Sequence, residues 1–119
     1  MMKDCLMDWL GQQAAACEAR RVELAAEGRA DEATFERIRY NVYDLFRTTV
    51  GAVHRAEPDE KAAWWLFERR LNDIPSTWQR SHDLAELHGD VKKAHIERIK
   101  LDAATEIRTR YEELRGKKA

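Results

Sequence analysis

The segment from Phe35 to Ala52 repeats an apolar residue at alternating spacings of three and four. Such spacing returns each side chain to one face of an α-helix, and it fits neither face of a strand. A second apolar set widens this face to nearly half of the helix circumference, which is more than one neighbouring helix can cover. The segment therefore predicts a helix that packs against two others. The first set is Phe35, Ile38, Val42, Leu45, Thr49 and Ala52, and the second is Tyr43, Phe46, Val50 and Val53.

Helical repeats of apolar residues also precede and follow this segment. A first helix is expected over about residues 3–27, where Gly28 supplies the usual residue beyond a helix C-terminus. Asp31 is expected to cap the N-terminus of the second helix. The last helix is expected to begin after Gly89 and to cover about residues 90–114. No part of the sequence alternates as a strand does.

Pro75 lies in the middle of the remaining helical segment, which the sequence predicts over residues 58–88. A proline inside a helix removes one backbone donor and clashes with the preceding turn. Ser76 and Gln79 have the spacing of a capping box, which is typical of a helix N-terminus. The sequence therefore predicts a third helix that starts with Pro58 in its first turn and is broken or kinked near Pro75.

Four helical segments of similar length, joined by short connections, must fold back on one another as antiparallel neighbours. The predicted fold is therefore all-α, an antiparallel up-down-up-down four-helix bundle formed by a single domain over residues 1–119. Two alternatives use the same pattern. One is a three-helix core with a loosely docked first helix, and the other is a dimer that completes the bundle between two chains.

The charge balance argues against two classes of partner. The chain has 21 Lys and Arg residues against 22 Asp and Glu residues, a formal net charge of −1. No overall field therefore favours nucleic acid or an anionic membrane. In the last helix the basic residues are interrupted by Glu97, Asp102 and Glu106. Binding to nucleic acid or to a membrane is accordingly not predicted.

The N-terminal segment and the two cysteines favour a cytoplasmic location. The first residues lack both the basic region and the long apolar run of a secretory signal. Cys5 and Cys17 are expected on one helix, roughly 18 Å apart, which is too far for a disulfide. Both are therefore expected to be reduced thiols.

The histidines do not have the pattern of a bundle metal centre. Di-metal sites in four-helix bundles usually need a Glu-x-x-His pair on each of two helices, and none of the four histidines has a glutamate three residues before it. The best remaining candidates are His82 and Glu86, which share a helix face, with His95 beyond the Gly89 turn. The sequence predicts no metal or other cofactor and leaves this cluster as an alternative site.

Signatures of nucleophilic catalysis are also missing. Neither Cys5 nor Cys17 has a histidine in its own helix to act as a base. Cys17 lies on the apolar face, where a cysteine behaves as a small hydrophobic residue. The sequence has no Gly-rich phosphate loop, Walker lysine, Gly-x-Ser-x-Gly elbow or Cys-x-x-Cys pair. A protein without enzymatic activity is therefore favoured.

Two adjacent tryptophans, Trp64 and Trp65, cannot both face the bundle core, because neighbouring helical residues point about 100° apart. Trp64 belongs to the core face, so Trp65 is expected on a second apolar patch. The candidate interface consists of Trp65 with Ala62, Leu66 and Arg69. This patch is either covered within the chain, by the first helix or by the segment after the proline, or it contacts another protein.

These patterns favour a non-enzymatic helical bundle that acts through protein–protein interaction, as a homodimer. The alternative hypothesis is an enzyme, or a bundle that binds a ligand or metal through the histidine and carboxylate cluster around His82 and His95.

Overall fold

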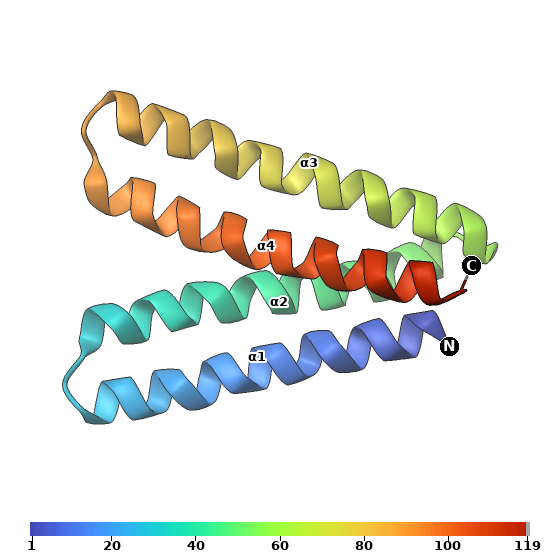
Figure 1. Cartoon of the computed structure of the whole chain (residues 1–119), viewed down its shortest axis with the longest axis horizontal. Coiled ribbons are helices and arrows are strands. Elements are labelled where there is room, and N and C mark those ends of the chain that lie inside the picture. Colours follow the sequence, from blue (N-terminus) through green and yellow to red (C-terminus); the bar gives the residue numbers. More distant parts are fainter. Residues whose placement is uncertain (119) are drawn as a thin grey trace.

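The computed structural model describes residues 1–118, and it describes the side chains of residues 1–116. These residues form four helices and no strand, and each helix runs antiparallel to the one before it (Figure 1). The prediction of an all-α four-helix bundle is thereby confirmed. No helix in the described chain has an apolar stretch long enough to cross a membrane. The helices are α1 (Met2–Ala26), α2 (Ala30–Ala56), α3 (Glu60–Leu87) and α4 (Val91–Lys118).

Two glycine turns connect α1 to α2 and α3 to α4, and both lie at the same end of the bundle (Figure 1). Gly28 and Gly89 have φ angles of 76° and 71°, in the left-handed region that other residues adopt only at a cost. This conformation lets Arg29 N donate to Leu24 O at 2.9 Å, so that a carbonyl in the last turn of α1 keeps a partner. The prediction that Gly28 ends the first helix is confirmed.

The N-termini of α2 and α3 differ from the predicted ones. Asp31 does not cap α2: the N-cap position is held by Arg29, and Asp31 lies in the first turn. The Gly28 turn causes this shift, because it allows the helix to begin two residues earlier. In α3, Asp59 is the N-cap and accepts a hydrogen bond from Ala62 N at 3.0 Å. The predicted start at Pro58 was therefore two residues too early.

The apolar core fills the half of the bundle that contains the N-terminus of α1 and the C-terminal part of α4. All four helices contribute to it, so α1 is not loosely docked and no second chain is needed to complete the bundle. Helices α2 and α4 contact each other across the bundle, whereas no Cα of α1 lies within 8 Å of one in α3. Helices α1 and α3 therefore lie at opposite corners. The most enclosed core side chains are Leu6, Leu10, Tyr43, Phe46, Val50, Phe67, Leu71, Ile107 and Tyr111.

Helix α3 continues through Pro75, so of the two predicted outcomes, a break or a kink, the break does not occur. Proline has no N–H to offer the carbonyl of Leu71, four residues earlier. That carbonyl instead accepts a hydrogen bond from Arg108 Nη2 of α4 at 3.2 Å. Ser76 makes no N-terminal cap, and its hydroxyl donates to Asp73 O within the helix. A bend of more than about 20° at this point stays a prediction.

We expect the Arg108 contact to be worth more in the presence of Pro75 than in its absence. Arg108→Ala should lower the free energy of unfolding by about 1–2 kcal/mol, because it leaves a shielded carbonyl without a donor. In a Pro75→Ala background the new N–H can bond to Leu71 O, so the same substitution should have a clearly smaller effect. Urea denaturation of the four proteins in this double-mutant cycle measures the difference. Equal effects of Arg108→Ala in both backgrounds would contradict the explanation.

Candidate interaction surface

The outer face of α3 carries a ridge of four exposed side chains: Lys61, Trp65, Arg69 and Asp73. Their spacing of four places them in a row that winds obliquely along the helix surface. Because α3 lies at a corner of the bundle and contacts only α2 and α4, this face points away from the rest of the chain. We call these four residues the α3 ridge. Asp73 was not among the predicted interface residues, although its spacing from Trp65 and Arg69 in the sequence could have revealed it.

Trp65 is the central apolar side chain of the ridge, and 59% of its surface is exposed. Neither α1 nor the part of α3 after Pro75 covers it. The guanidinium carbon of Arg69 lies 5.1 Å from the centre of the Trp65 ring, within range of a cation–π contact. The structure thus leaves the indole in water on one side and holds a cation against it.

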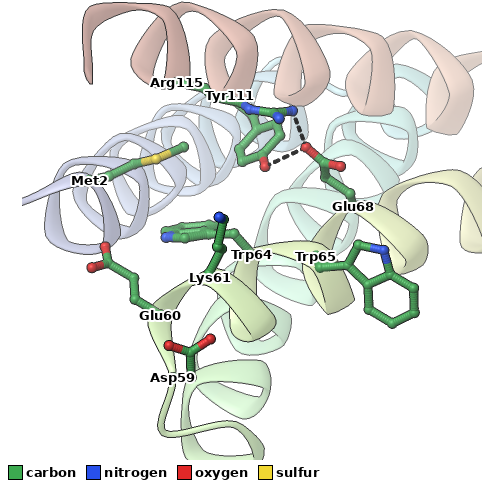
Figure 2. A pocket seen from close by; sticks show the side chains of 9 residues that line it. All are labelled: Met2, Asp59, Glu60, Lys61, Trp64, Trp65, Glu68, Tyr111 and Arg115. Atoms are coloured by element: carbon green, nitrogen blue, oxygen red, sulfur yellow. Dashed lines mark hydrogen bonds and ion pairs between the residues drawn. The ribbon is translucent and has the colours of Figure 1, made fainter. Parts of the chain in front are cut away.

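Trp64 points in a different direction from Trp65, and Figure 2 shows the two rings diverging from the same helix. Its ring centre lies 5.6 Å from that of Phe67 and 5.7 Å from that of Tyr111. Trp64 therefore packs against the core, and it fixes the rotation of α3 that turns Trp65 outward.

The other two predicted interface residues, Ala62 and Leu66, are only partly exposed. Leu66 packs against the core cluster and lines a groove between α2 and α3 together with Leu45 and Ile74. The place of Leu66 in the interface stays a prediction, and its side chain is less exposed than that of Trp65. It lies about 100° further round the helix, where α2 covers part of it.

Hollows lie on both sides of Trp65, and its side chain forms a wall of each. The larger hollow has a volume of about 630 Å³ and is floored by Trp64 and Tyr111 (Figure 2). The smaller one, of about 440 Å³, extends past Arg69 and Asp73. An exposed ring between two hollows can enter a depression on a partner protein. Side chains of that partner can at the same time fill the two hollows beside Trp65.

The polar groups on one side of the larger hollow already pair with each other. Tyr111 Oη donates to Glu68 Oε1 at 2.8 Å, and Arg115 pairs with the same carboxylate. Burial, followed by the contact with Glu68, raises the pKa of Tyr111, so the phenol stays protonated and keeps donating. Trp64 Nε1 is shielded from solvent and has no hydrogen-bond partner among the described residues.

The structure brings together only two of the three predicted residues of the alternative site, His82 and Glu86. His82 Nε2 lies 3.2 Å from Glu86 Oε1, as their spacing of four predicts. The same nitrogen lies 3.4 Å from Arg98 Nη2, and this nearby cation opposes binding of a metal ion. His95 does not join them, because its ring packs edge-on against Phe35 of α2 at 4.7 Å. Within residues 1–118 no three His, Cys, Asp or Glu side chains are placed to hold one metal ion.

Cys17 is buried in the apolar core, as its place on the apolar face of α1 predicts, and charged side chains that the sequence did not indicate lie near it. Burial, followed by the nearby negative charge of Glu36, raises the pKa of its thiol to about 11. Glu36 also lies 3.8 Å from Arg39, while Tyr43 donates a hydrogen bond to Glu106 of α4. A thiol with this pKa is protonated at neutral pH and is a poor nucleophile.

We expect the two cysteines to react very differently. In the folded protein, a thiol reagent at neutral pH should modify one equivalent rapidly, that of the exposed Cys5. A second equivalent, from Cys17, should appear only after unfolding in urea. Cys5→Ser is the control and should abolish the rapid phase. Two rapid equivalents in the native wild type would mean that α1 opens readily and that its docking is weak.

No protein-family model matches the chain, and no curated protein or solved structure is similar enough to count as a match. The function is therefore inferred from the geometry of the chain itself.

Proposed function

We propose that the chain is a non-enzymatic helical bundle that binds a second copy of itself through the outer face of α3. The observation that carries this proposal is the exposure of Trp65, with Arg69 against its ring and no described part of the chain over it. The bundle is complete without a partner, so the second copy binds to a finished fold.

An exposed tryptophan of this kind is a typical anchor of a protein interface. Tryptophan and arginine are enriched among the residues that contribute most to binding, and removal of such a side chain costs about 2 kcal/mol or more. The indole gains from leaving water, and it has a flat face against which a cation can stack. Trp65 and Arg69 supply both features on adjacent turns.

A second copy suits this surface because the ridge carries both signs of charge. Lys61 and Arg69 are positive and Asp73 is negative. When two ridges meet, Asp73 of each copy can pair with one basic group of the other copy, and one basic group per copy has no carboxylate partner. In a two-fold dimer the same patch is presented by both subunits and must complement itself. The formal net charge of −1 adds little long-range repulsion between copies.

The competing function, a ligand-binding or metal-binding bundle, has less support. It needs His82 and His95 together, and they contact different neighbours: Arg98 for the first and Phe35 for the second. We also propose that the protein acts in the cytoplasm. Two unpaired cysteines support this location, since oxidising compartments favour disulfides.

Sedimentation equilibrium over micromolar to submillimolar concentrations tests the proposal. The wild type should dimerise, and Trp65→Ala should weaken the dimer by about thirty-fold or more, the equivalent of 2 kcal/mol. Leu87→Ala is the matched control, because Leu87 is also an apolar residue of α3 and is 78% exposed, but it lies far from the ridge. It should leave the dimer unchanged. A monomeric wild type, or equal effects of the two substitutions, would defeat the proposal.

A further inference from the structure

The order of residues along the α3 ridge specifies how two copies meet. We propose that the two α3 helices cross antiparallel on a two-fold axis level with Phe67, so that Lys61 pairs with the partner's Asp73 and Trp65 stacks with the partner's Arg69. This inference rests on the proposed function, because it concerns the same surface and the same partner.

The first support is the position of each residue along the helix. Lys61 and Asp73 lie at equal distances before and after position 67, and so do Trp65 and Arg69. A two-fold axis at that level, perpendicular to the helices, brings Lys61 level with the partner's Asp73 and Trp65 level with the partner's Arg69. Each of these contacts is therefore made twice in the dimer. Phe67 itself points into the core and does not obstruct the axis.

The second support is the direction of each side chain around the helix. At about 100° per residue, Trp65 and Arg69 lie roughly 20° on either side of a common line. Lys61 and Asp73 lie roughly 60° on either side of the same line. The row is thus inclined to the helix axis, and Lys61 meets the partner's Asp73 where the two helices cross at an angle that lays the two rows along each other.

The third support is the availability of the charged groups. Neither the Lys61 ammonium nor the Asp73 carboxylate forms an ion pair with a described side chain of its own chain, and both residues are exposed.

Rows of side chains spaced by four are inclined to the helix axis, and two such rows run side by side when the helices cross at about −50°, the commonest crossing in globular proteins.

The opposite orientation is disfavoured by charge. If the two helices were parallel and in register, Lys61 would face Lys61, Arg69 would face Arg69, and Asp73 would face Asp73. Like charges in contact oppose association, and such repulsion selects among alternative arrangements. The indole supplies most of the attraction in either case, while the order of charges selects the antiparallel one.

Charge reversal tests this arrangement. Lys61→Asp and Asp73→Lys should each weaken the dimer about ten-fold or more, because each places two like-charged pairs in contact. The double variant, Lys61→Asp with Asp73→Lys, restores opposite charges at both places and should return the dissociation constant to within about three-fold of wild type. Sedimentation equilibrium at low salt measures all four proteins, and high salt should reduce the differences.

A double variant as weak as the single ones would overturn the register. If the wild type still dimerises and Trp65→Ala still weakens the dimer, the proposed function survives that result. A monomeric wild type would instead defeat the proposed function and the register together.

Thiol crosslinking gives a second, independent measurement. In a Cys5→Ser background, Lys61→Cys with Asp73→Cys should be joined between chains by a short bifunctional maleimide. The two positions within one helix are roughly 18 Å apart, beyond the reach of such a reagent. Lys61→Cys alone should not crosslink, because the two copies of residue 61 lie at opposite ends of the contact. Efficient crosslinking of that single variant would contradict the antiparallel arrangement.

Discussion

The packing of Phe67 into the bundle decides which way every other side chain of α3 points. Its ring centre lies 5.3 Å from that of Tyr111 and 5.6 Å from that of Trp64, and the ring is fully enclosed. Helix α3 cannot rotate about its axis without removing these rings from the core, which would cost several kcal/mol. The orientation of α3 that keeps these rings in the core also turns Trp65 and the ridge outward. The exposed surface is therefore a consequence of the core.

Much of the fold could be predicted because the relevant forces act within a few residues. The helix over residues 35–52 and the glycine at the end of α1 follow from local patterns, and both predictions were confirmed. The predicted packing of α2 against two helices was wrong, because α2 contacts all three others. The predicted main apolar face was also wrong in part: Leu45 and Ala52 are exposed, whereas Tyr43, Phe46, Val50 and Val53 of the second set are all buried. The continuity of α3 through Pro75 could not be predicted from local patterns. The donor that replaces its missing N–H is Arg108 on α4, and the sequence around the proline holds no sign of it. Ser76 and Gln79 have the spacing of a cap, but the helix continues through both residues.

The candidate site could be predicted only in part, for a related reason. The outward direction of Trp65 follows from the angle between successive helical residues, so the sequence alone could indicate it. How far Leu66 is covered depends on where α2 lies, and that is a tertiary fact. The separation of His95 from His82 also depends on how two helices face each other beyond a turn. The turn at Gly89 does not by itself determine which faces of α3 and α4 meet.

The ridge lies over the half of the bundle that the apolar core fills. The segment of α3 that carries it is held by the core residues Phe67 and Leu71. A surface on a rigid segment loses little conformational entropy when it binds, and more of the gain from burying Trp65 then remains as affinity.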